Sequence, residues 1–302
     1  MIMHESNNLE NSMEIIPSNH WIIGSNGVYH GTPRNSWTRV GAQEYGISSL
    51  IREPNRLLAG ASWGSGLWEW TENSDRWKQL HDETLTEVIA IASIGGNPGL
   101  IAGSPYGVAT GSYDEIGAVR WTHHSDTLQV NERFTNAILV HPRDTSTWLI
   151  GTESGVIVTT NSGSTWKQTT ITDTPVRALI YGQNLFWAGT DNKGIWCSED
   201  GIHWLSVGHT VDGGAIFGLS EAGNSILAGT EHGVAIGDSS GKWNRMGPRY
   251  LCASVACHPR SSLSWLSGGA PGGLWYTQDG GEYWYQIEGF VNVHSILAPR
   301  EA

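Results

Sequence analysis

Seven short apolar runs recur along the chain, and each of them ends in glycine. An alternating apolar and polar stretch precedes most of these runs, as at residues 136–140 and 176–180, and another one follows after a short loop. Such alternation over about four to eight residues is typical of β-strands, so each unit begins with three strands. The seven glycines that end the runs are Gly24, Gly60, Gly103, Gly151, Gly189, Gly229 and Gly268.

A polar turn that leads to a tryptophan completes each unit with a fourth strand. The clearest copies are residues 159–166 (TTNSGSTW) and 277–284 (TQDGGEYW), and residues 197–204 (CSEDGIHW) form a degraded copy. In the first copy, Asn161 can hydrogen-bond to its own backbone and Gly163 can take a positive φ angle. The tryptophans of the seven units are 38 to 45 residues apart, at Trp37, Trp77, Trp121, Trp166, Trp204, Trp243 and Trp284.

Seven units of four strands, which we call A to D in chain order, predict an all-β, seven-bladed β-propeller. The first unit begins with a strand B at residues 20–24, whereas residues 290–297 read as a strand A without a unit behind it. We therefore expect the C-terminal strand A to pair with the N-terminal strands B–D and to close the ring, which leaves no open edge. This predicts a flexible tail over residues 1–16 and a single propeller over residues 17–302.

The polar turn resembles the Asp-box, also called the BNR repeat, of sialidase-like β-propellers, whose pattern is Ser/Thr-x-Asp-x-Gly-x-Thr-Trp. Residues 159–166 and 277–284 match it best, and the accompanying strand pattern covers nearly the whole chain. The resemblance implies the propeller fold. Such propellers include sialidases, xyloglucan-cleaving hydrolases, sortilin-like receptors and photosystem II assembly factors, so function has to be argued from this chain's own residues.

Composition narrows the class of partner. The chain has 302 residues, 39 of them glycine and 16 tryptophan, and a formal net charge of −12. This charge argues against a nucleic-acid partner, because binding to phosphates needs a basic surface. No apolar run is long enough to span a membrane, and residues 1–16 lack the pattern of a secretory signal. The three cysteines show no metal-binding or disulfide spacing, so we predict a cytoplasmic protein without a membrane partner.

Most of the negative charge is expected at one end of the propeller. The loops from strand D to the next strand A and from strand B to strand C surround one mouth of the central channel, which we call the top end. These loops contain twelve carboxylates, three bases and five histidines. The carboxylates are Glu44, Asp82, Glu83, Glu87, Asp126, Glu132, Glu153, Asp173, Asp191, Asp212, Glu231 and Glu288; the bases are Arg133, Lys193 and Arg249; the histidines are His81, His123, His124, His209 and His232.

Five residues at this end are candidates for acid–base catalysis. Glu153, Asp191 and Glu231 occupy matching B–C loop positions on adjacent blades, His232 follows Glu231, and His294 on a strand A is expected to face the channel. Crowded carboxylates raise one another's pKa, which would place a protonated acid beside an ionised base. The same groups could hold a divalent metal ion. Alternatively, each acid serves only its turn, since each follows Gly-Thr where a polar loop is expected.

The candidate substrate-binding residues at the top end are Tyr45, Trp63, Tyr106, Arg249 and Tyr250. The aromatic rings could stack on a sugar or a planar ligand, or attract a cation, and packing at the rim is the alternative for each. The two arginines among the bases are too few for the arginine cluster that the resemblance implies for a sialidase.

Three functions follow from these features. The first is an enzyme that acts on a small-molecule substrate at the acidic, histidine-containing mouth, as a lyase, cyclase or hydrolase with acid–base or metal-assisted chemistry. The second is a non-catalytic scaffold whose top end docks a basic protein partner. The third is a carbohydrate-binding lectin that uses grooves between blades, which the divergence of the repeats disfavours. We favour the first.

Overall fold

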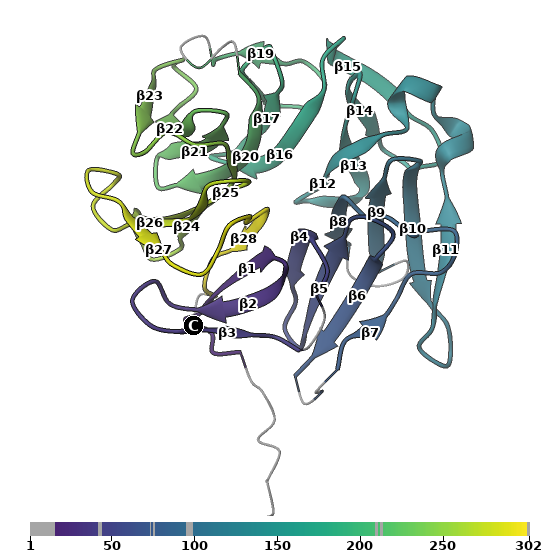
Figure 1. Ribbon diagram of the computed structural model, residues 1–302. Helices are drawn as coiled ribbons and strands as arrows, with labels where there is room; N and C mark the ends of the chain where they lie inside the picture. Colours follow the sequence, from purple (N-terminus) through teal and green to yellow (C-terminus); the bar gives the residue numbers. More distant parts are fainter. Residues whose placement is uncertain are drawn as a thin grey trace, which may run out of the picture.

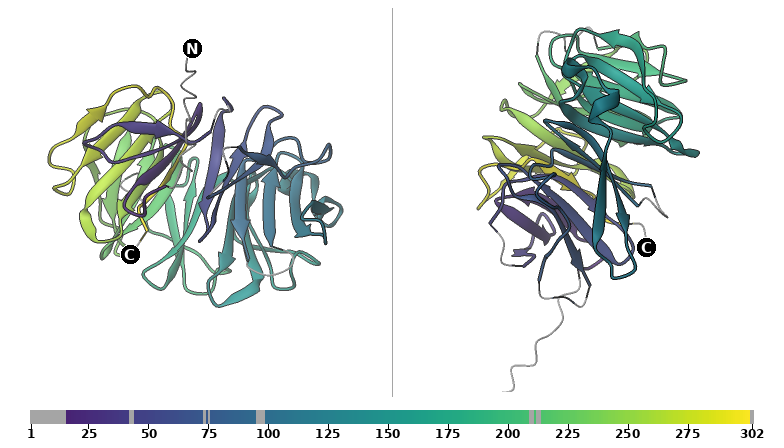
Figure 2. Two further views of the ribbon diagram at one scale, coloured as in Figure 1. Left: turned by 90° about the horizontal axis from the view of Figure 1, so that it is seen from below. Right: turned by 90° about the vertical axis from the view of Figure 1, so that its right-hand side faces the viewer.

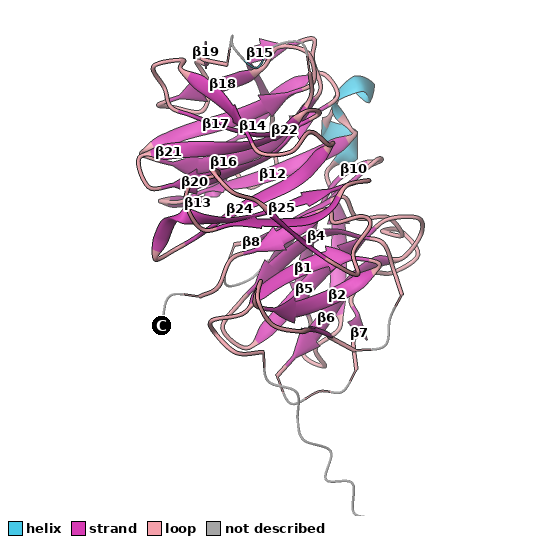
Figure 3. Cartoon of the chain, turned by 60° about the vertical axis from the view of Figure 1, so that its left-hand side comes forward, coloured by secondary structure: helices cyan, strands magenta, loops and turns pink. Residues whose placement is uncertain are grey.

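The computed structural model describes residues 16–41, 44–72, 74, 76–94, 99–208, 211 and 214–300. They form seven four-stranded antiparallel sheets arranged as the blades of a ring (Figure 1). The all-β, seven-bladed propeller predicted from the sequence is confirmed. Strands dominate the described chain (Figure 3), and two 3₁₀ helices, Ser125–Thr127 and Val130–Glu132, lie in one D–A loop. No helix among the described residues has the length and apolar character needed to cross a membrane.

Each blade runs from an inner strand A to an outer strand D. Blades 1 to 4 are β4 (Ile47–Arg52), β5 (Arg56–Ala61), β6 (Gly66–Thr71) and β7 (Lys78–Gln79); β8 (Ala90–Ser93), β9 (Leu100–Ser104), β10 (Gly107–Tyr113) and β11 (Val119–His123); β12 (Thr135–His141), β13 (Asp144–Thr152), β14 (Gly155–Thr159) and β15 (Lys167–Thr172); and β16 (Val176–Gly182), β17 (Leu185–Thr190), β18 (Ile195–Ser198) and β19 (Leu205–Ser206). Blades 5 to 7 are β20 (Ile216–Ala222), β21 (Ser225–Thr230), β22 (Gly233–Gly237) and β23 (Trp243–Met246); β24 (Cys252–His258), β25 (Ser261–Gly269), β26 (Gly273–Thr277) and β27 (Tyr285–Ile287); and β28 (Ser295–Leu297), β1 (Trp21–Ser25), β2 (Gly27–Gly31) and β3 (Trp37–Arg39).

The two ends of the chain close the ring in blade 7. The C-terminal β28 pairs with β1, with Ile22 opposite Leu297 and Ile23 opposite Ile296. The seven A strands then contact one another in order around the central channel (Figure 1). Side views show the blades standing around the channel with connecting loops at its two ends (Figure 2). The predicted clasp between strand A and the N-terminal strands is confirmed.

The repeated glycine of strand B is needed because the next blade packs directly against it. A Cβ atom on Gly189 would lie 2.6 Å from Cγ2 of Ile216, a distance at which neighbouring atoms must move. The same contact recurs around the ring, between this glycine and the residue at or just before the start of the next strand A. The seven pairs are Gly24–Ile47, Gly60–Val88, Gly103–Thr135, Gly151–Val176, Gly189–Ile216, Gly229–Cys252 and Gly268–Val293. Glycine therefore sets how closely the blades approach in a densely packed interior.

The residue after this contact is turned toward the channel. In five A strands the pairing register shifts around that residue, as in a β-bulge, which re-aims a side chain. These residues are Ser48, Asn136, Arg177, Phe217 and Ala253. Ile89 and His294 hold the same position just before β8 and β28, where their N–H groups donate to the carbonyl oxygens of Gly103 and Gly24. Each blade thus contributes one inward side chain at the top end.

The polar C–D turns share one pattern of hydrogen bonds. In blade 3, the hydroxyl of Thr159 accepts from the N–H of Gly163 at 3.0 Å, and Asn161 accepts from the N–H of Thr165 at 2.9 Å. In blade 4, Ser198 and Asp200 play these two roles, so the copy that looks degraded in sequence is a turn one residue shorter. Blade 6 repeats the pattern. These turns lie at the end of the propeller opposite the top end.

Candidate functional site

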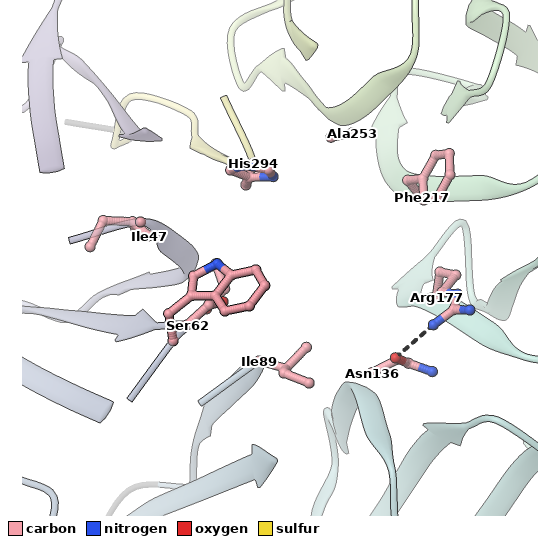
Figure 4. A pocket seen from close by; sticks show the side chains of 11 residues that line it. Ile47, Ser62, Ile89, Asn136, Arg177, Phe217, Ala253 and His294 are labelled. Atoms are coloured by element: carbon pink, nitrogen blue, oxygen red, sulfur yellow. Dashed lines mark hydrogen bonds between the residues drawn. The ribbon is translucent and has the colours of Figure 1, made fainter. Parts of the chain in front are cut away.

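A cavity of about 290 Å³ opens where the seven A strands begin, at the top end of the channel. Its wall contains the inward side chain of every blade (Figure 4). We call these seven residues the channel ring: Ser48, Ile89, Asn136, Arg177, Phe217, Ala253 and His294. Blade 1 adds Gly46, Ile47, Ser62 and Trp63 to the wall. The cavity, which we call the channel pocket, therefore combines polar and apolar side chains from all blades.

Arg177 is the charged residue of the channel ring and is held by two carboxylates. Its Nε and Nη2 atoms donate to Oδ1 and Oδ2 of Asp191 at 2.9 and 2.8 Å. Its Nη1 atom donates to Oε1 of Glu153 at 2.7 Å and to Oδ1 of Asn136 at 3.0 Å. Asn136 in turn donates through Nδ2 to Glu153 at 3.0 Å. The hydrogen bonds to Asp191 raise the pKa of Arg177, and the bidentate pairing fixes the plane of the guanidinium group.

Glu153 and Asp191 are brought together, as their matching loop positions suggested, but around a cation. Arg177 ion-pairs with both carboxylates, so a positive charge lies between the two negative charges. The catalytic roles predicted for Glu153 and Asp191 stay predictions. Sequence reasoning placed Arg177 on a strand A without a role. The position of Arg177 in the repeat was the available signal. It directly follows Val176, the residue that packs against Gly151 of the preceding blade, and the meaning of that position becomes clear only when the blades are superposed.

His294 lies across the channel pocket from Asn136 and Arg177 (Figure 4). The side chain is exposed to the channel, yet the protein around it displaces water, and this desolvation lowers the pKa of His294 below 6.5. The imidazole is therefore neutral near pH 7 and can accept a proton. The structure places this residue where the sequence predicted, in the channel, and its catalytic role stays a prediction.

Glu231 and His232 lie on the B–C loop of blade 5, and both side chains are exposed. Neither belongs to the wall of the channel pocket. The channel-ring residue of blade 5 is the uncharged Phe217, so Glu231 has no counterpart there to the pairing of Asp191 with Arg177 among the described residues. The structure thus divides the five catalytic candidates into a pair bound to Arg177, one histidine in the pocket and one exposed pair on the rim.

The five substrate-binding candidates are also divided. Trp63 lines the pocket, is 92% exposed and has a φ angle of 61°, a backbone conformation that bulky residues rarely adopt. Tyr45 stacks on Trp68 at 5.1 Å, and Tyr250 stacks on Trp275 at 5.9 Å. Those two rings pack at the rim and lie outside the pocket wall, which is the alternative that the sequence left open.

Two candidates remain exposed on the rim without reaching the pocket. Tyr106 is 69% exposed on the B–C loop of blade 2, next to the first 3₁₀ helix, where its carbonyl oxygen accepts from the hydroxyl of Ser125. Arg249 is exposed on the loop before β24. Neither contributes to the wall of the channel pocket, so a ligand confined to that pocket would not touch them.

The other top-end histidines have local partners. His81 accepts from the backbone N–H of Leu67 at 3.0 Å, His123 lies 2.8 Å from the hydroxyl of Thr84, and His124 lies 3.1 Å from the hydroxyl of Thr110. His209 and Asp212 lie outside the described residues. Over the described ranges, no three His, Cys, Asp or Glu side chains come together as metal ligands would. The divalent metal ion considered from the sequence stays a prediction.

A second cavity, of about 510 Å³, lies against the C–D turn of blade 4 and is lined by residues that include Cys197, Trp204 and Leu205. Glu199 and Asp200 are its two acidic residues. Asp200 accepts hydrogen bonds from the backbone of the same turn and ion-pairs with His203 at 2.7 Å. The hydrogen bonds of Asp200 thus stabilise the turn itself. The channel pocket is the stronger candidate because it gathers a side chain from each of the seven blades.

No protein-family model and no curated protein sequence matches this chain. Solved structures do match. The extracellular domain of a protein assigned to the one-component systems of B. thetaiotaomicron is 15% identical with a TM-score of 0.66, over 93% of this chain and 47% of that one. A GH74 xyloglucanase from Xanthomonas campestris is 14% identical with a TM-score of 0.62, over 88% and 46%. A Bacteroides fragilis protein assigned as a 6-phosphogluconolactonase is 12% identical with a TM-score of 0.65, over 92% and 97%.

The chain thus spans about half the length of the first two structures and nearly all of the third. Identities this low indicate a common fold and leave the activity to be argued from the site. The comparisons and the blade topology agree that this chain is a β-propeller with seven blades.

Proposed function

We propose that this chain is a hydrolase that acts on a small organic molecule in the channel pocket. The observation that carries the proposal is the placement of a neutral imidazole, His294, across one cavity from the N–H donors of Arg177 and Asn136. A neutral imidazole can serve as a general base. Donors held in place can stabilise an oxygen on which negative charge develops. The xyloglucanase and the protein assigned as a lactonase favour hydrolysis over the lyase and cyclase chemistry also considered from the sequence.

In the proposed reaction, His294 accepts a proton from a water molecule as the water oxygen bonds to the electrophilic carbon of the substrate. The bond from that carbon to the leaving oxygen then breaks, and the leaving oxygen takes the proton back from the imidazolium. Arg177 and Asn136 donate hydrogen bonds to the oxygen that remains on the carbon. Glu153 and Asp191 act as positioning residues, because their hydrogen bonds fix the guanidinium group.

The test is turnover of chromogenic esters, lactones and aryl glycosides by the purified protein, followed by a pH profile with the best substrate. We expect kcat/KM to rise with pH and to level off above an apparent pKa below about 6.5, because protonated His294 cannot accept a proton. Turnover of none of these compounds, or a rate that falls as the pH rises through this range, would contradict the proposal.

A second candidate function is docking of a basic protein partner at the top end. It is favoured by large apolar side chains that are exposed on the loops there: Trp63 at 92%, Val130 at 81% and Tyr106 at 69%. Exposed apolar groups rimmed by charged residues mark interaction surfaces, and the surrounding loops carry the carboxylates that would attract a basic partner. This surface is separate from the channel pocket except at Trp63.

We also infer that the polar turns of blades 3, 4 and 6 are Asp-boxes of the sialidase-like type. Each uses one hydroxyl and one carboxylate or amide oxygen to bind N–H groups of the same turn. Because these turns lie at the end away from the pocket, the relationship bears on the origin of the fold and not on the chemistry.

A further inference from the structure

We propose that the channel pocket selects an uncharged carbonyl compound with an apolar body, as in a carboxylic ester or amide; the location of the site rests on the function proposed above. The juxtaposition that points to this class is a pair of N–H donors flanked on both sides by apolar side chains. In the order of the blades, the channel ring reads Ile89, Asn136, Arg177 and Phe217, and Figure 4 shows these four side chains along one side of the pocket.

The unused hydrogen-bonding groups of this wall are donors. A guanidinium group has five N–H bonds and a primary amide has two. Arg177 donates four of its five N–H bonds to Asp191, Glu153 and Asn136. Asn136 donates one of its two N–H bonds to Glu153. One N–H of each side chain therefore remains without a partner among the described residues. Two donors on neighbouring side chains of one wall match in number the two lone pairs of one carbonyl oxygen.

The charges around these donors disfavour ionised ligands. Arg177 contributes one positive charge, and Glu153 and Asp191 contribute two negative charges against it. An anionic ligand would therefore approach a cluster that already carries net negative charge. A cationic ligand would face the N–H groups of Arg177 and Asn136. The carboxylate oxygens directed toward these two side chains already accept hydrogen bonds from them. A neutral oxygen acceptor avoids both costs.

Apolar side chains on either side of the donors define the rest of the ligand. Ile89 lies next to Asn136 in the ring, and Phe217 lies next to Arg177, each on an adjacent blade. Both are partly exposed in the pocket and can bury apolar groups on the two substituents of a carbonyl carbon. A sugar ring, with hydroxyl groups on all sides, would leave its hydroxyls facing these side chains, so we place esters and amides before glycosides.

The experiment is calorimetric titration of the full chain with three probes of matched shape: phenylacetamide, phenylacetate and phenethylamine, each up to about 10 mM. We expect phenylacetamide to bind at least about tenfold more tightly than either charged probe. Asn136→Ala and Arg177→Lys should each weaken phenylacetamide by about tenfold; the lysine keeps the charge beside Glu153 and Asp191 but loses the fork of donors. The control Leu263→Ala changes an exposed side chain on β25, outside the pocket, and should bind as the unsubstituted protein does.

Equal or tighter binding of a charged probe, no binding of any probe, or unchanged binding in both pocket variants would overturn this inference. Unfolding curves of each variant show whether the fold is kept, and Asn136→Ala carries the test if Arg177→Lys does not fold. If phenylacetamide binds as expected but no ester is hydrolysed, the ligand class stands and the hydrolase proposal fails. If esters are hydrolysed while both pocket variants bind phenylacetamide normally, the hydrolase proposal stands and the ligand class fails.

Discussion

Replacing Gly189 with alanine is expected to lower the free energy of unfolding by about 2 kcal/mol. The added methyl carbon would lie 2.6 Å from Cγ2, 2.9 Å from Cβ and 3.0 Å from the carbonyl oxygen of Ile216. Ile216 is fully buried in the core between blades 4 and 5, so the strand cannot move aside without disturbing its packing. Because the carbonyl oxygen belongs to the backbone, rotation of the isoleucine side chain alone does not relieve the contact.

The matched control for this substitution is Gly46→Ala. A Cβ on Gly46 would have no neighbour within 4 Å, and Gly46 has an ordinary φ angle. We expect its stability to change by less than about 0.5 kcal/mol. Urea unfolding of both variants measures the difference. If Gly189→Ala is as stable as Gly46→Ala, the close contact of the blades is not what requires the repeated glycine.

Replacing His294 with asparagine is expected to reduce kcat/KM for a hydrolysed substrate by about a hundredfold or more. Asparagine keeps a polar side chain of similar size but cannot take up the proton that leaves the attacking water. The residual activity should also lose the rise with pH, since that rise reports the deprotonation of this imidazole. Steady-state kinetics over a pH series, together with an unfolding curve, separates this effect from a loss of folded protein.

The control for this variant is His141→Asn. His141 lies at the end of β12 in the A–B turn, away from the top end, where its Nδ1 atom accepts from the N–H of Arg143. We expect that variant to keep full activity. A contrary outcome is equally clear: if His294→Asn stays active while His232→Asn loses activity, the general base belongs to the rim of blade 5 and the channel pocket is not the site.

The sequence was sufficient for the fold because each blade repeats its own local signals. The glycine that ends strand B, the polar turn and the tryptophan after it recur with nearly constant spacing, and the unpartnered strands at the two chain ends required closure. Even the shortened turn of blade 4 kept its hydrogen bonds by using Ser198 and Asp200. These features depend on residues close together in the sequence, so the repeat pattern is sufficient to predict them.

The site was predicted less well because it depends on contacts between blades. Glu153 and Asp191 were selected for their loop positions, but their shared partner, Arg177, reaches them from β16 through a bulge that no local pattern marks. Glu231 has the same loop position, but the channel-ring residue of its blade is Phe217 and not an arginine. Tyr45 and Trp63 are both aromatic residues of top-end loops, yet one stacks on Trp68 and the other stays exposed in the pocket. Whether such an aromatic side chain is packed or exposed depends on its neighbours in the fold and not on its residue type.

The most direct test is a crystal structure of the full chain soaked with phenylacetamide. The account predicts the ligand in the channel pocket, with its carbonyl oxygen within hydrogen-bonding distance of both Arg177 and Asn136 and its ring against Phe217 or Ile89. A ligand found only in the cavity beside Trp204, or a channel pocket that holds water alone at saturating ligand, would contradict it.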